Sequence, residues 1–182
     1  MEQVKKAEIM DEGAMRRAIN RISYEIIECN HGASNLVLAG VRTRGVFLAE
    51  RMAAKITEVE GTCPQVISLD ITGFRDDKPV GKDCVSLPEI ENISNKTVII
   101  VDDVLYTGRT VRAAMEAVLH MGRAQRIQLA ALIDRGHREL PIRPDFVGKN
   151  LPTSRTELVR VYVKEYDGKD SVVIVTGAQS VE

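Results

Sequence analysis

Two acids, Asp102 and Asp103, stand between an apolar run at residues 98–101 and a small-residue turn at residues 107–110. The run is Val-Ile-Ile-Val, which suits a strand buried on both faces, as in a parallel sheet. The turn, Thr-Gly-Arg-Thr, opens into residues 111–121, which are rich in Ala, Met, Leu and Glu and predict a helix. The two acids therefore lie at the end of a predicted strand and close to the start of a predicted helix.

This arrangement predicts a site for a phosphorylated sugar. Ligands of open α/β sheets bind beyond the carboxyl ends of the strands, and a turn that opens a helix offers free N–H groups and a positive dipole to a phosphate. Gly108 lets the backbone approach an anion closely, and the hydroxyls of Thr107 and Thr110 can donate to its oxygens. Carboxylates repel phosphate unless they bind something else, so we expect Asp102 and Asp103 to bind the sugar diol or a divalent cation.

The elements around this motif predict an α/β fold. Strands are expected at about residues 36–41, 66–72, 97–104 and 127–134, and most of them alternate with helices. That alternation predicts a doubly wound, mostly parallel sheet. Residues 73–95 are polar and turn-rich and predict a lid, whereas residues 158–165 and 172–176 predict a strand pair at a sheet edge or in a small hood.

Composition bounds the class of protein. The chain has 182 residues, 44% hydrophobic and 28% charged, which suits one domain over residues 1–182. Its net charge of −1 means that any nucleic-acid contact needs a local basic patch. The scattered cysteines Cys29, Cys63 and Cys84 favour free thiols in a reducing compartment. We find no signal-peptide core and no run that could span a bilayer, so we expect a cytoplasmic protein without membrane contact.

Residues 98–110 resemble the 5-phosphoribosyl-1-pyrophosphate (PRPP) motif of type I phosphoribosyltransferases. Residues 101–112 and 134–143 are similar to one branch of that family, whose members make UMP and regulate pyrimidine operons. The resemblance runs from about residue 16 to residue 154. It implies the type I fold with a flexible lid loop at about residues 73–95 and a small hood, and the conversion of uracil and PRPP to UMP and pyrophosphate. Mg²⁺ would enter with PRPP, without direct protein ligands.

The resemblance also assigns site residues. Catalysis would fall to Asp102, Asp103 and Arg138, although Arg138 is equally readable as part of a charged rim. The phosphate of PRPP would bind the loop made of Val104, Leu105, Tyr106, Thr107, Gly108, Arg109 and Thr110. Pyrophosphate would bind Thr43 and Arg44, in a loop that often contains a non-proline cis peptide in this family, with Arg75 reaching it on closure or remaining a solvated loop arginine.

Base choice is implied by the loop that holds Asp134, Arg135 and His137. The 6-oxopurine branch usually carries an acid immediately before Thr-Gly, where this chain has Tyr106, so hypoxanthine and guanine are disfavoured as acceptors. A neutral residue there does not separate uracil from the remaining bases. The choice of uracil depends on the resemblance of residues 134–143.

A basic helix face is the candidate RNA surface. Arg17, Asn20, Arg21 and Tyr24 lie opposite the apolar stripe of a helix predicted over residues 12–29. The alternatives are a solvated face or a surface for the leader mRNA of a pyrimidine operon, extended by Arg143. Members of the branch often carry Thr and His where Asn20 and Tyr24 stand.

Three hypotheses follow from the sequence. The chain is a uracil phosphoribosyltransferase that also binds leader mRNA in a UMP-dependent manner, with UMP or UTP as regulator. Alternatively, it has only one of these two activities, either as an RNA-binding regulator with little turnover or as an enzyme without RNA regulation. The third is a plain doubly wound domain whose two acids hold Mg²⁺ for another purpose, but such a domain does not need Thr-Gly-Arg-Thr. Members of the family usually form homodimers or higher homo-oligomers, so we expect one here.

Overall fold

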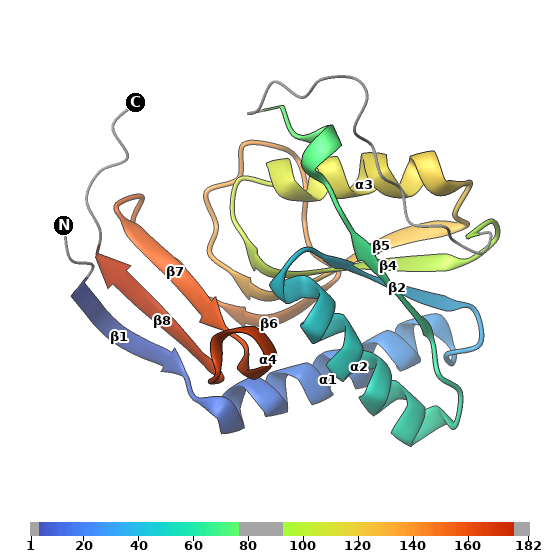
Figure 1. The fold of residues 1–182 in the computed structure, drawn as a ribbon, viewed down its shortest axis with the longest axis horizontal. Helices are drawn as coiled ribbons and strands as arrows, with labels where there is room; N and C mark the ends of the chain where they lie inside the picture. Colours follow the sequence, from blue (N-terminus) through green and yellow to red (C-terminus); the bar gives the residue numbers. More distant parts are fainter. Residues whose placement is uncertain (1–3, 77–92, 177–182) are drawn as a thin grey trace.

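The computed structural model describes residues 4–76 and 93–176, and its centre is a parallel five-stranded sheet (Figure 1). The strand order is β3-β2-β4-β5-β6. The strands are β2 (Leu36–Val41), β3 (Gln65–Leu69), β4 (Thr97–Leu105), β5 (Arg126–Asp134) and β6 (Phe146–Asn150). All four predicted strands are confirmed, although β3 ends before a short 3₁₀ turn, η1 (Thr72–Phe74), that the sequence did not predict.

Helices cover both faces of this sheet, as predicted for a doubly wound fold. Helices α1 (Glu12–Asn30) and α2 (Arg44–Glu60) pack on one face, and α3 (Arg109–Met121) packs on the other (Figure 1). The apolar run of β4 serves both cores, because Ile99 and Val101 face α1 and α2 whereas Val98 and Ile100 face α3. Burial on both faces explains why the run is continuously apolar.

The register of β4 creates the edge where a site can form. Gly40 near the end of β2 pairs with Val101 of β4, whereas Leu105 at the end of β4 still pairs with Asp134 of β5. Strand β4 therefore runs past β2 but keeps β5 as its neighbour. Asp102 and Asp103 lie on this overhanging part.

A second, antiparallel sheet forms the hood, with strand order β1-β8-β7. Its elements are β1 (Val4–Met10), β7 (Glu157–Tyr162), the short helix α4 (Lys164–Asp167) and β8 (Ser171–Thr176). The predicted strand pair therefore belongs to the hood. The prediction of a strand to residue 165 was wrong, since β7 ends at Tyr162 and α4 follows, and neither β1 nor β6 was predicted.

Two predictions remain to be compared with the structure, the lid loop and the absence of a membrane-spanning segment. Residues 77–92 of the predicted lid at residues 73–95 lie outside the described residues. Across the described ranges 4–76 and 93–176, the structure contains no helix of the length and hydropathy that membrane crossing would require.

Candidate active site

The carboxyl ends of β2, β3 and β4 surround a cavity of about 470 Å³. Its lining includes Arg42, Thr43, Asp70, Asp102 and Asp103. A second cavity of about 250 Å³ lies under the turn that opens α3, and residues 104–111 line it together with Arg75 and Asp102. Because the two cavities share lining residues, the predicted acids, phosphate loop and pyrophosphate loop belong to one site.

The two acids have different surroundings. Asp102 is buried, with 6% of its surface exposed, and its Oδ1 accepts a 2.9 Å hydrogen bond from the N–H of Asp103. Asp103 is half-buried and accepts a 2.7 Å bond from the N–H of Val104. Burial, followed by the charge of Asp103, raises the pKa of Asp102 well above its ordinary value. Burial also raises the pKa of Asp103, against the opposing effects of the Val104 N–H and Arg44.

The phosphate loop turns at Gly108, which adopts φ +95° and precedes the first residue of α3. A Cβ at this position would lie 3.4 Å from side-chain atoms of Leu140 and Ile142, so the loop packs closely against the segment after β5. The side chain of Arg109 forms 2.8 Å ion pairs with Asp76 and Glu139. Arg109 can thus offer its backbone N–H to a phosphate while its guanidinium is engaged elsewhere.

The predicted pyrophosphate loop lies at the start of α2. The peptide bond between Arg42 and Thr43 is cis, the feature that the family resemblance implied. A Cβ on Gly45 would lie 2.4 Å from the carbonyl oxygen of Val101, so the loop rests directly on the end of β4. The guanidinium of Arg44 forms a bidentate pair with Asp167 of α4 and is therefore directed at the hood.

One cavity residue escaped the sequence analysis. Asp70 follows β3, forms a 2.9 Å ion pair with Arg42, and accepts a 3.0 Å hydrogen bond from the N–H of Thr72. The side-chain and backbone bonds of Thr72, together with Arg42, lower the pKa of Asp70. The signal was present in the sequence, because Asp70 follows an apolar strand in the same way as Asp102.

Two arginines of the predicted base loop have structural partners. Arg138 donates to the carboxylate of Asp134 at 2.6 Å and to the carbonyls of Tyr106 at 2.7 Å and Ile142 at 3.0 Å. Arg135 is buried and donates to the segment between β6 and β7. Both side chains therefore hold the loop in place in this structure. The catalytic role of Arg138 and the uracil contact of Arg135 stay predictions.

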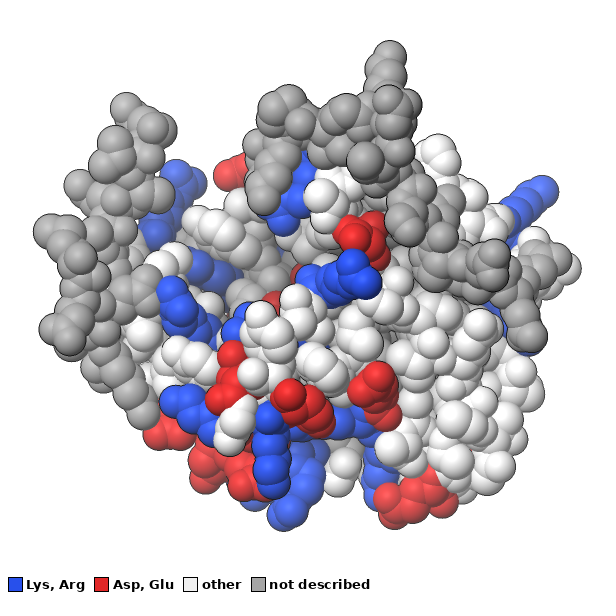
Figure 2. Space-filling model, in the orientation of Figure 1, with Lys and Arg blue, Asp and Glu red and all other residues white. Residues whose placement is uncertain are grey.

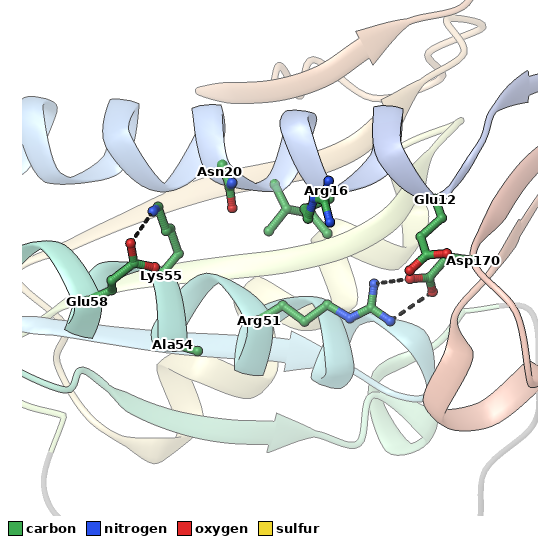
Figure 3. A pocket seen from close by; sticks show the side chains of 9 residues that line it. Glu12, Arg16, Asn20, Arg51, Ala54, Lys55, Glu58 and Asp170 are labelled. Carbon is green, nitrogen blue, oxygen red and sulfur yellow. Dashed lines mark hydrogen bonds and ion pairs between the residues drawn. The ribbon is translucent and has the colours of Figure 1, made fainter.

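The side chains of the candidate RNA surface on α1 have different surroundings. Arg21 donates to the carbonyls of Val147 and Gly148 in β6, whereas Asn20 lines a hollow of about 370 Å³ between α1 and α2 (Figure 3). Tyr24 is 50% exposed, and the ammonium of Lys55 lies 5.4 Å from its ring centre.

Two further observations limit that surface. Arg143 lies apart from α1, beside Val111 and Met115 of α3 on the opposite face of the sheet. Figure 2 shows positive and negative side chains side by side along the lower rim of the molecule, so positive charge there is largely paired with negative charge.

Comparison with known proteins defines the class. The family described as "Phosphoribosyl transferase domain" matches residues 6–173, so the chain belongs to the phosphoribosyltransferase family. It is 53% identical over 170 residues to "Bifunctional protein PyrR" of Leuconostoc mesenteroides subsp. mesenteroides, with 92% of this chain and 97% of the relative covered. The protein of the same name from Clostridioides difficile is 55% identical over 177 residues, covering 94% and 98%.

Solved structures confirm the predicted type I fold. A hypoxanthine phosphoribosyltransferase from Staphylococcus aureus superposes with a TM-score of 0.70 at 19% identity, covering 95% of this chain and 96% of the other. The hypoxanthine phosphoribosyltransferase of Trypanosoma cruzi gives a TM-score of 0.71 at 17% identity, covering 96% and 92%. At these identities the likeness extends to the fold and not to the choice of base.

Proposed function

We propose that the chain transfers the 5-phosphoribosyl group of PRPP to uracil, forming UMP and pyrophosphate, and that it also binds the leader mRNA of a pyrimidine operon in a UMP-dependent manner. The observation that carries the enzymatic part is the meeting of Asp102 and Asp103 with the Gly108 turn in one pair of cavities. Identity above 50% to relatives named bifunctional PyrR supports the combination of both activities.

The chemistry follows from the charges of the site. Breaking the bond between C1 of the ribose and pyrophosphate builds positive charge on the sugar, and the new bond from C1 goes to a nitrogen of uracil. Asp102 and Asp103 bind the two ribose hydroxyls and stabilise that charge. The Thr107–Thr110 turn fixes the 5′-phosphate, so that catalysis consists of positioning and electrostatics without a covalent nucleophile.

Mg²⁺ fits the donor set of this site. It is usually bound through one or two carboxylates together with substrate phosphates, and it keeps several waters. PRPP itself would supply the oxygens that hold the ion, and Asp102 and Asp103, next to the loops proposed for the two phosphate groups, would accept hydrogen bonds from its waters. A magnesium ion that arrives with PRPP would neutralise part of the charge of the departing pyrophosphate.

We propose that the leader mRNA binds to the exposed side of α1. Arg17 is exposed and has no side-chain partner among residues 4–76 and 93–176, which leaves its guanidinium available to a phosphate of RNA. Asn20 and Lys55 line the hollow between α1 and α2. The exposed Tyr24 ring lies beside Lys55, and a base could stack on it. We propose a cytoplasmic homo-oligomer in which bound UMP, and by analogy UTP, favours RNA binding.

One pair of assays tests this proposal. UMP formation is measured with PRPP and labelled uracil, and hypoxanthine, guanine and orotate are offered as competing acceptors. Binding of a pyrimidine-operon leader RNA is measured with and without UMP. Turnover of uracil together with UMP-dependent RNA affinity is the expected result. Turnover alone would reduce the protein to an enzyme, RNA affinity alone would reduce it to a regulator, and a preference for hypoxanthine would overturn the choice of base.

A further inference from the structure

The sheet order defines the side of the site from which the base must approach. Strands β2 and β5 flank β4, and the loop after β2 is the proposed pyrophosphate side. PRPP carries its pyrophosphate on one face of the ribose, and UMP carries its base on the opposite face, so the entering base lies across C1 from the leaving group. The acceptor side of the site is therefore the β5 side, where Tyr106 and His137 lie.

An aromatic ring is held at this place. The guanidinium carbon of Arg135 lies 4.1 Å from the centre of the Tyr106 ring, in cation–π geometry. The ring of His137 meets the Tyr106 ring edge-on, with 5.9 Å between centres. A cation over its face and a second, roughly perpendicular ring thus hold the Tyr106 ring in place.

Arg135 is itself held by the hood side of the molecule. Only 4% of its surface is exposed, and it donates to Thr153 Oγ1 at 3.1 Å, to the Ser154 carbonyl at 3.1 Å and to the Glu157 carbonyl at 2.7 Å. Its backbone N–H donates to the carbonyl of Leu105 at 3.1 Å, next to Tyr106. With Nε and Nη2 engaged and only 4% of its surface exposed, Arg135 has little surface left for a direct contact with a base.

We propose that Arg135 is a positioning residue for the acceptor base, which fixes the Tyr106 ring on the acceptor side of the site and ties it to the start of β7. This inference rests on the proposed phosphoribosyl transfer and names the residue that controls uracil affinity. The Tyr106 ring borders the space of the base, and Arg135 prevents its rotation. A base is then selected by a surface that the hood holds in place, without a charged contact to the base.

The test separates the base from the ribose phosphate. Variants Arg135→Lys, Tyr106→Phe and Tyr106→Leu and the double variant Arg135→Lys/Tyr106→Leu are compared for KM of uracil, KM of PRPP, and calorimetric affinity for UMP and for ribose 5-phosphate. Arg51→Lys is the matched control, because Arg51 also ties the hood to the core, through Glu165 and Asp170, without touching Tyr106. Thermal unfolding monitors the fold of each variant.

Arg135→Lys and Tyr106→Leu should each raise the KM of uracil and lower the affinity for UMP by about tenfold. This is the scale of a lost cation–π contact. KM of PRPP and affinity for ribose 5-phosphate should stay near those of the wild type. Tyr106→Phe keeps the ring, so it should lose much less uracil affinity than Tyr106→Leu. The double variant should be no worse than Tyr106→Leu, because Arg135 acts through that ring.

Two outcomes would overturn the inference. One is an additive loss of uracil affinity in the double variant, and the other is an equal loss of uracil and PRPP affinity in Arg135→Lys. The calorimetric arm keeps the inference separate from the proposed function. A wild-type chain without turnover that binds UMP in an Arg135-dependent manner overturns the enzymatic proposal alone, whereas wild-type turnover with Arg135-independent uracil affinity overturns this inference alone.

Discussion

The guanidinium of Arg44 and the carboxylate of Asp167 form a bidentate ion pair, with Nε–Oδ2 and Nη2–Oδ1 distances of 2.9 and 2.7 Å. The ring of Tyr166 adds a cation–π contact at 5.4 Å from the guanidinium carbon to the ring centre. The pair lowers the pKa of Asp167 and raises that of Arg44. The hood therefore neutralises a cation that belongs to the proposed pyrophosphate loop.

Replacing Asp167 by Asn should strengthen the binding of pyrophosphate. The variant frees the charge of Arg44 while leaving a side chain of the same shape, and we expect the product-inhibition constant of pyrophosphate to fall by about threefold to tenfold. Asp170→Asn is the control, because Asp170 pairs with Arg51, away from the loop. Weaker pyrophosphate binding in Asp167→Asn would mean that Asp167 orients Arg44 toward the ligand and does not compete with the ligand for Arg44.

Stability should fall in acid because of the carboxylates of α4. The arginine partners lower the pKa of Asp167 and of Glu165 in the folded state, so both groups stabilise the fold above their unfolded pKa values and lose that contribution as the pH falls through the lowered values. The midpoint of thermal unfolding should therefore drop steeply below about pH 4. In Asp167→Asn this drop should be shallower, and an identical pH profile would exclude the pair as a source of acid sensitivity.

The central sheet could be predicted because its strands are buried on both faces and carry that burial in their composition. Strand β6 reads Phe-Val-Gly-Lys-Asn and has no such signature, because it becomes a strand by pairing with the edge of β5. In β1, alternating charged and apolar residues were visible, but their partner β8 follows more than 150 residues later. Short α4 has four residues, too few for a helical period.

The sequence predicted which backbone segments form the site, but not the directions of its long side chains. Acids at a strand end and a glycine turn are local signals, and Asp102, Asp103 and Gly108 lie together as expected. The direction of a long side chain is not local. Arg44 and Arg135 are engaged by residues of the hood and of the segment before it, and nothing near them in sequence indicates those partners.

Removing the charge of Asp102 should stabilise the free protein and impair the enzyme. Burial raises the pKa of Asp102, so the acid favours folding below its unfolded pKa and loses that contribution as the pH rises through the raised value. Asp102→Asn keeps the acceptor for the Asp103 N–H and should gain about 1 kcal/mol, or roughly 2–4 °C, at neutral pH but not near pH 4. A gain that does not change with pH would exclude the charge as its source.

Turnover provides the second readout for the acids. Asp103→Asn should lower kcat on the order of 100-fold, because the variant no longer stabilises the positive charge of the ribose. The folded state should change little, since Asn can still accept the hydrogen bond from the Val104 N–H. Unchanged turnover with uracil and PRPP would remove Asp103 from the mechanism.

Thr107→Val should weaken the binding of PRPP and of ribose 5-phosphate by about tenfold or more, which is the cost of one hydrogen bond to a charged group. Among residues 4–76 and 93–176, the Thr107 hydroxyl accepts a single long bond of 3.4 Å from the Arg109 N–H, so its proton is available to a phosphate. Thr57→Val is the control, because that hydroxyl bonds to the Ala53 carbonyl within α2. Equal affinities of wild type and Thr107→Val would exclude the hydroxyl from the phosphate contact.

RNA binding by α1 is tested most cleanly at Arg17. This side chain is exposed, and Arg17→Ala should weaken leader-RNA binding and reduce the salt slope of affinity by about one, as expected for one lost phosphate contact. UMP synthesis and the unfolding temperature should not change. Arg123→Ala removes the same charge just after the end of α3 and should leave RNA affinity intact.

Arg21→Ala should also weaken RNA binding without loss of UMP synthesis, but it should lower the unfolding temperature as well. The reason is that Arg21 donates to the carbonyls of Val147 and Gly148 at 3.1 and 2.6 Å and so fastens α1 to the edge strand β6. Comparison of Arg17→Ala with Arg21→Ala separates the loss of a direct RNA contact from a displacement of α1. If only Arg21→Ala affects RNA, the loss follows from a displaced helix, and α1 supplies no direct phosphate contact through Arg17.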